Sequence, residues 1–101
     1  EGFWQLLSRE RGTVIMPKHL RYIIERRRNR QRWLGAIAKA AIPIRLIDGA
    51  LDPISGAHMA ARYRELIANP DVVLLPELSH YPHVEDPAAV CAPFLAFHKL
   101  T

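Results

Sequence analysis

The chain has 101 residues, 50% hydrophobic and 24% charged, a balance typical of one small globular domain rather than of a disordered segment. The formal net charge of +4 arises mainly from residues 21–33, RYIIERRRNRQRW, where six arginines accompany one glutamate. The most apolar stretch, AIAKAAIPIRLI, is interrupted by Lys39, Pro43 and Arg45, so the sequence offers no segment suited to span a bilayer.

The single cysteine, Cys91, excludes a disulfide within the chain and favours a reducing, intracellular compartment. Because Cys91 lies in an apolar helical context, we expect a buried free thiol. The first residues, EGFWQLL, lack a methionine and already resemble the apolar face of a helix, which indicates a piece of a longer protein.

The first part of the chain is predicted to be helical. Residues 3–7 indicate the end of a helix, and the polar turn SRERG follows them. Pro17 predicts the start of a long helix that reaches about residue 40, since proline is tolerated in a first helical turn. Along this helix apolar residues recur at steps of three and four on both sides of an arginine-rich centre.

Beyond this helix, IRLID at residues 44–48 predicts a strand, because the run is apolar and lies between Pro43 and a glycine. The loop GALDPIS follows the strand. Ser55, near the end of this loop, is suited to cap a helix over residues 56–68.

VVLL, at residues 72–75, predicts a second strand that is apolar enough to be covered on both faces. After a loop, Pro87 begins a last helix, in which Val90, Phe94 and Phe97 are expected to face inward. One helix between two strands is long enough for a right-handed parallel crossover. The predicted fold class is therefore α/β with an incomplete sheet, whose other strands are expected in sequence not included here or in another chain.

Two polar side chains follow these predicted strands. Asp52 comes four residues after the first strand, and His80 comes five residues after the second. The carboxyl ends of neighbouring parallel strands share one edge of a sheet, so the two side chains can meet. An aspartate that accepts the Nδ1 proton of a histidine fixes its tautomer and stabilises the imidazolium, as a catalytic base requires. Asp48 is a rival acid, but it ends the strand itself and is better suited to bind local backbone.

The stretch LSHYPHVEDP, at residues 78–87, carries further candidates. His83 is better suited to a structural or exposed role than to catalysis. By residue type, a metal site could form from four side chains: His80, His83, Glu85 and Asp86. These residues lack the helical spacing of paired histidine ligands, and Pro82 stiffens the loop between them, so neither a metal nor a cofactor is expected. The preference of acids for the start of a helix is enough to explain Glu85 and Asp86.

Both loops resemble the C-terminal part of the α/β-hydrolase superfamily. There a GxxDP loop carries the acid, and a [GS]H-aromatic-P-x-x-E-x-P loop carries the catalytic histidine. GALDP at residues 49–53 and SHYPHVEDP at residues 79–87 match these loops residue by residue. The segment LRYIIERRRNRQRWLGAIAKAAIP resembles the last cap helix of the branch close to mesoderm-specific-transcript proteins, epoxide hydrolases and haloalkane dehalogenases. The likeness covers roughly residues 17–99.

The chain also departs from the family pattern at two points. Most members carry glycine where Ser79 stands, and the sequence has no nucleophile elbow of the GxSxG type or its aspartate equivalent. The resemblance implies that residues 1–41 end a helical cap and that residues 42–101 form the last βαβα part of the core.

In function, the resemblance implies that Asp52 and His80 are the acid and the base of a catalytic triad. Its nucleophile, an aspartate or a serine, would precede Glu1, so the chain would need the N-terminal part of the fold. The expected substrates are small apolar molecules of the epoxide, halide or ester type, and the 101-residue piece alone is expected to be inactive.

Two other classes of function remain open. A catalytically idle relative, kept as a scaffold or binding protein, would retain the same two residues. The arginine-rich helix also carries Tyr22 and Trp33, which would suit RNA or an acidic membrane surface. The apolar residues on both of its flanks favour packing instead, so binding of nucleic acid is not expected.

Overall fold

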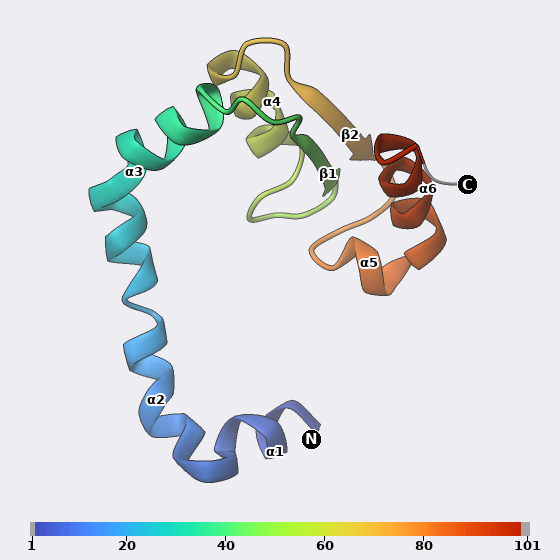
Figure 1. The fold of residues 1–101 in the computed structure, drawn as a ribbon. Helices are drawn as coiled ribbons and strands as arrows, with labels where there is room; N and C mark the ends of the chain where they lie inside the picture. The colour runs from blue at the N-terminus through green and yellow to red at the C-terminus, as the bar shows by residue number, and fades with distance from the viewer. Residues whose placement is uncertain (1, 100–101) are drawn as a thin grey trace. The chain divides into compact units, whose positions relative to one another are not determined.

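A computed structural model describes residues 2–99 of the chain (Figure 1). The chain divides into two compact units, of which the first ends at Ala36 and the second begins at Ile37. None of the helices within residues 2–99 is long and apolar enough to cross a membrane.

Within residues 2–36, the regular secondary structure of the first unit consists of helices. Its elements are α1 (Gly2–Ser8), the 3-10 turn η1 (Arg9–Arg11), α2 (Gly12–His19) and most of α3 (Tyr22–Ala38). Glu10 and Arg11 have φ angles of 50° and 65°, so the backbone is left-handed between α1 and α2. Residues other than glycine seldom adopt this conformation, and it ends the first helix where the SRERG turn was predicted.

The prediction that Pro17 opens a long helix is wrong. Pro17 lies inside α2, and a turn at residues 20–21 separates α2 from α3. At this turn the Arg21 N–H donates to the carbonyl of Lys18, three residues back, at 3.2 Å rather than four residues back. Proline lacks a backbone N–H and therefore suits the first turn of a helix, where the N–H groups have no partner within the helix. It does not specify how many helical residues precede it, so the sequence alone does not give the residue at which the helix begins.

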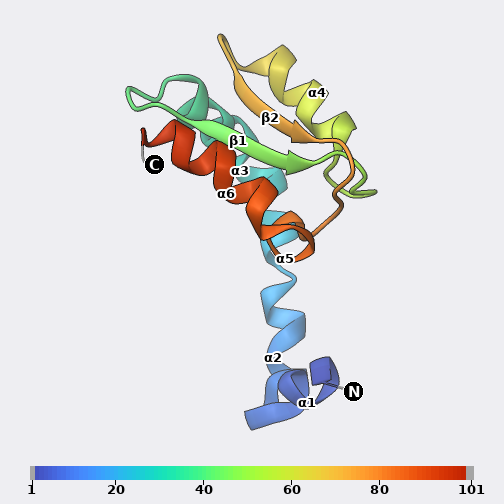
Figure 2. The same cartoon turned by 90° about the vertical axis from the view of Figure 1, so that its right-hand side faces the viewer.

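The second unit contains the predicted parallel sheet. Strands β1 (Arg45–Gly49) and β2 (Asp71–Leu75) pair in parallel, with Arg45 opposite Asp71 and Gly49 opposite Leu75. Helix α4 (Ala57–Leu66) connects the two strands, which confirms the predicted β-α-β order. Helices α4 and α6 (Pro87–Phe97) lie on opposite sides of the sheet (Figure 2). A short helix, α5 (Pro82–Glu85), lies in the segment that was predicted to be a loop.

Arg45, an unusual residue inside an apolar strand, connects α6 to the sheet through hydrogen bonds and a ring contact. Its Nε donates to both carboxylate oxygens of Asp71 at 3.0 Å, across the start of the two strands. Its Nη1 donates to the carbonyl oxygen of Pro93 in α6 at 2.9 Å, and the guanidinium lies 5.1 Å from the ring centroid of Phe97. The charge is therefore paired, which explains why the strand tolerates it.

Helix α6 begins as predicted but faces the sheet differently. Asp86 caps it by accepting a hydrogen bond from the Ala89 N–H at 3.0 Å. Phe94 was expected to face inward, but 49% of it is exposed, and Cys91, which was expected to be buried, is exposed as well. These two residues lie three apart on one helical face, while the contacts of Arg45 with α6 are made to Pro93 and Phe97.

Little of the apolar surface is covered by the described residues themselves. Within residues 2–99, Ala60 in α4 is the one fully buried hydrophobic residue. Large apolar side chains of α1, α2 and α3 are exposed, including Phe3, Trp4 and Ile24. Residues 2–99 thus form helices and one two-stranded parallel sheet, which lies in the second unit, and both units have open apolar surface.

Candidate functional site

The loop after β1 folds around the side chain of Asp52. Oδ1 of Asp52 accepts a hydrogen bond from the Ile54 N–H at 2.8 Å. Aspartate side chains often form this turn by bonding to the backbone two residues further along the chain. The carbonyl oxygen of Asp52 accepts from the Gly56 N–H at 3.0 Å. A Cβ at position 56 would collide with the backbone of Asp52 and Ala50, so the loop closes this tightly only with glycine there.

The loop after β2 is held against the first loop by backbone contacts. The Leu51 N–H donates to the carbonyl oxygen of Leu78 at 2.9 Å, and the Ala50 N–H donates to that of Leu75, also at 2.9 Å. Gly49, the last residue of β1, is buried beneath this crossing. A Cβ at position 49 would lie 2.8 Å from the Leu78 oxygen and closer still to the Ser79 oxygen. The absence of a side chain at Gly49 therefore allows the two loops to approach.

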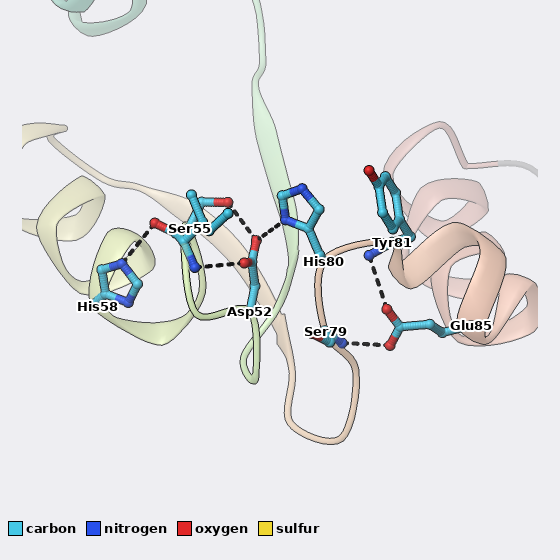
Figure 3. A network of polar contacts seen from close by, with 8 residues as sticks. Asp52, Ser55, His58, Ser79, His80, Tyr81 and Glu85 are labelled. Carbon is cyan, nitrogen blue, oxygen red and sulfur yellow. Dashed lines mark hydrogen bonds and ion pairs between the residues drawn. The ribbon is translucent and has the colours of Figure 1, made fainter. Parts of the chain in front are cut away.

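The two loops bring Asp52 and His80 into contact, as the strand order suggested. Nδ1 of His80 lies 2.8 Å from Oδ2 of Asp52 (Figure 3). The Asp52 side chain is only 3% exposed, whereas 43% of the His80 side chain is exposed. An ionised carboxylate can only accept, so Nδ1 donates, and Nε2 of the neutral ring is left without a proton. An unprotonated Nε2 on an exposed ring can accept a proton from a reacting group.

Ser55 is a member of this site that the sequence analysis assigned differently. It was expected to cap α4, but Gly56 occupies the cap position and no side chain caps the helix. Instead the Ser55 hydroxyl donates to Oδ2 of Asp52 at 2.6 Å, the same oxygen that His80 contacts. A hydroxyl that donates to an ionised carboxylate makes a stronger hydrogen bond than one between neutral groups.

The hydrogen bonds to Asp52 determine its charge. The Ser55 hydroxyl does most to hold the pKa of Asp52 well below its ordinary value of 3.8, although burial acts in the opposite direction. The bonds from His80 and from the backbone of Ile54 and Ser55 lower this pKa further. Asp52 is consequently ionised at neutral pH, as an acceptor for Nδ1 must be.

Asp48, the rival acid, does not contact His80. Burial raises the pKa of Asp48 above its ordinary value, and the charge of Asp52 raises it further. A bond from the Gly49 backbone acts in the opposite direction. Its Oδ2 is buried and has no hydrogen-bond partner among residues 2–99. Of the two acids near the end of β1, Asp52 is the one that the structure joins to the histidine.

The remaining polar residues of the second loop bind backbone. Glu85 accepts hydrogen bonds from the N–H groups of Ser79 and Tyr81, and Asp86 caps α6. Glu85 lies in the single turn of α5, just before α6, and its side chain reaches back to the loop, a contact that the explanation by a helix start did not include. His83 is exposed, with its ring 6.3 Å from that of Tyr81 between centroids. No group of three or more potential metal ligands occurs within residues 2–99.

Comparison with known proteins identifies relatives over most of the chain. Mesoderm-specific transcript protein of Mus musculus is 34% identical over 96 residues, which cover 93% of this chain and 29% of the relative. Its homologue in Homo sapiens is 33% identical over the same length. A Mycobacterium tuberculosis protein named "Putative hydrolase LipZ" is 38% identical over 86 residues, which cover 85% of this chain and 30% of the relative.

The chain thus spans less than a third of the length of these curated relatives. No family model and no solved structure matches it. The two loops that meet at Asp52 and His80 therefore occur in a chain that is homologous to mesoderm-specific transcript protein and to LipZ. Similarity to a protein named as a hydrolase is in keeping with the resemblance of the two loops to α/β-hydrolases.

Proposed function

We propose that this chain supplies the acid and the base of the catalytic triad of an α/β-hydrolase, with Asp52 as the acid and His80 as the base. The observation that carries the proposal is the 2.8 Å contact between Oδ2 of Asp52 and Nδ1 of His80. The two residues come from loops that follow neighbouring parallel strands, where such sites form in α/β folds. Homology to a protein named as a hydrolase supports the same class of reaction.

The nucleophile, a serine or an aspartate, is proposed to lie outside these 101 residues. With a serine, Nε2 of His80 takes the hydroxyl proton as the oxygen attacks an ester carbonyl, and then delivers it to the departing alcohol. With an aspartate, the carboxylate displaces a halide, which departs as an anion, or opens an epoxide, whose oxygen takes up a proton from solvent; in either case the carboxylate becomes an ester. Nε2 then takes a proton from the water that attacks the ester carbonyl.

In both cases the imidazolium that forms on His80 lies against the ionised Asp52, which stabilises it. Neither route needs a metal or an organic cofactor. The proposed substrates are small apolar esters, epoxides or halides.

We also propose that further segments cover the open apolar surface of the chain. A parallel sheet of two strands is rarely stable alone, and within residues 2–99 only Ala60 is a buried hydrophobic residue. In this proposal residues 1–41 belong to a helical cap, and the sheet is extended by strands outside the chain. The greater length of the relatives is in keeping with such additional segments.

The test compares two histidines of the same loop in the full-length protein. His80→Gln removes the base, so turnover of an ester, epoxide or alkyl halide should fall by about 10³-fold or more. His83→Gln is the matched control, because the His83 ring is exposed and lies beside the ring of Tyr81, and this variant should retain most of the activity.

Mass spectrometry of the His80→Gln variant identifies the nucleophile class. An aspartate nucleophile still forms its ester without His80, so the protein should gain the mass of the substrate-derived group. A serine nucleophile needs His80 for the first step and should gain none. Equal loss of turnover in both variants would contradict the assignment, and no turnover in the wild-type protein would favour a catalytically idle scaffold.

A further inference from the structure

The Glu85 carboxylate contacts the backbone on both sides of His80. Oε2 accepts a hydrogen bond from the Ser79 N–H at 2.6 Å, and Oε1 accepts one from the Tyr81 N–H at 3.0 Å. These are the residues directly before and after His80 (Figure 3). One side chain therefore fixes the two peptide groups that flank the histidine.

The local chain path explains how Glu85 reaches this position. The carbonyl oxygen of Tyr81 accepts from the Val84 N–H at 2.8 Å and from the Glu85 N–H at 2.9 Å, which closes the single turn of α5. Pro82 occupies the first position of this turn, where proline is favoured. The turn directs the Glu85 side chain back toward the segment that carries His80.

The contact requires a carboxylate. Each of its two oxygens accepts from a different N–H, and hydrogen bonds to an ionised acceptor are stronger than those between neutral groups. Glutamine has one acceptor oxygen, and its amide NH₂ would face the second backbone N–H as a competing donor. Alanine would leave both N–H groups without this partner.

His80 depends on such support because its strand ends well before it. Strand β2 ends at Leu75, and the bond between Leu78 and Leu51 lies two residues before the histidine. The His80 side chain is 43% exposed, so packing against the Asp52 carboxylate and the Tyr81 ring covers it only in part. We propose that Glu85 is a positioning residue, whose carboxylate fixes the backbone around His80 and so keeps Nδ1 on Asp52.

The expected effect of Glu85 on turnover rests on the proposed function. Its expected effect on the position of His80 does not. The tautomer of His80 is therefore the main readout. Nitrogen-15 NMR of the full-length protein distinguishes an imidazole protonated at Nδ1 from one protonated at Nε2. In the wild-type protein we expect the Nδ1–H form, because Nδ1 donates to Asp52.

The variants are Glu85→Gln, Glu85→Ala and the control Asp86→Ala. Both Glu85 variants should lose much of the Nδ1–H form, and kcat should fall roughly 10- to 100-fold with little change in KM, as expected for a misplaced catalytic group. Asp86→Ala removes the cap of α6, a structural contact in the same segment, and should leave both the tautomer and kcat unchanged. Glu85→Gln conserves shape, so it reports on positioning even if Glu85→Ala does not fold.

Two results would overturn the inference. One is a Glu85→Gln protein with the wild-type tautomer and kcat, and the other is an Asp86→Ala protein that shows the same changes. If the tautomer shifts as expected in the Glu85 variants while the wild-type protein has no hydrolase activity, the positioning role stands and the proposed function fails. If wild-type activity depends on His80 but not on Glu85, the proposed function stands and the positioning role fails.

Discussion

Gly49→Ala tests how the two loops come to meet. The new Cβ would lie 2.8 Å from the Leu78 oxygen and closer to the Ser79 oxygen, whereas ordinary contact begins at 3.4 Å. The Leu78 oxygen must therefore retreat by about 0.6 Å, and the Ser79 oxygen by more. A retreat of this size would lengthen the 2.8 Å contact between Asp52 and His80 to about the limit of a hydrogen bond.

The expected cost follows from overpacking at a buried position. Forcing an additional methyl group into a close backbone contact costs about 1–3 kcal/mol of unfolding free energy. For a domain of this size, each kcal/mol lowers Tm by about 4–8 °C. In the full-length protein, turnover should fall by about 100-fold, because an error of about 1 Å at the reacting groups has that effect.

Gly35→Ala is the matched control, since a Cβ there would have no heavy atom within 4 Å. Gly35 lies inside α3, where alanine is the better helix former by about 1 kcal/mol, so this variant should be as stable as the wild type or more stable. Thermal unfolding and turnover of the two variants provide the comparison. If Gly49→Ala unfolds at the same temperature as Gly35→Ala and retains its turnover, the account of the loop crossing is refuted.

Three further predictions concern charge and completeness. Arg45→Met should lower the free energy of unfolding by about 1–2 kcal/mol, because it removes a paired guanidinium; the 41% exposure of Asp71 keeps the loss this small. Arg62→Met breaks an exposed ion pair and should lower the free energy of unfolding by less than about 0.5 kcal/mol. Urea unfolding measures both values. Ser55→Ala should raise the pKa of Asp52 toward 3.8, so the variant should be less stable than the wild type above about pH 4. This difference should shrink as the pH falls further and Asp52 becomes protonated in the folded state, and unfolding measured from pH 2 to 7 would contradict the reasoning if the difference grew instead. The 101-residue chain alone should hydrolyse no ester, epoxide or alkyl halide, and activity on such a panel would show that the nucleophile lies within it.

The sequence predicted the second unit better than the first, for a physical reason. IRLID and VVLL are short apolar runs bounded by glycine or proline, so their strand character and parallel pairing followed from local pattern and connection length. The first unit has the periodicity of helices but no signal for where they break. Pro17 lies within a helix, and the left-handed residues Glu10 and Arg11 are not glycines.

The site could be located from the sequence, but its supporting contacts could not. Asp52 and His80 each follow a strand at a distance that places them at one edge of the sheet, and their catalytic role remains a prediction. Ser55 and Glu85 were interpreted from their distance to a helix start. In the structure both bind partners that come into reach only when the loops fold, namely the Asp52 carboxylate and the backbone around His80.

The central claim is that Asp52 and His80 act as one unit, and a double-mutant cycle in the full-length protein tests it most directly. Turnover is measured for Asp52→Asn, His80→Gln and the double variant. Residues that act together lose little more in combination than the worse single variant loses alone. The account predicts a double variant with about the kcat/KM of His80→Gln, and two losses that multiply as independent effects would contradict it.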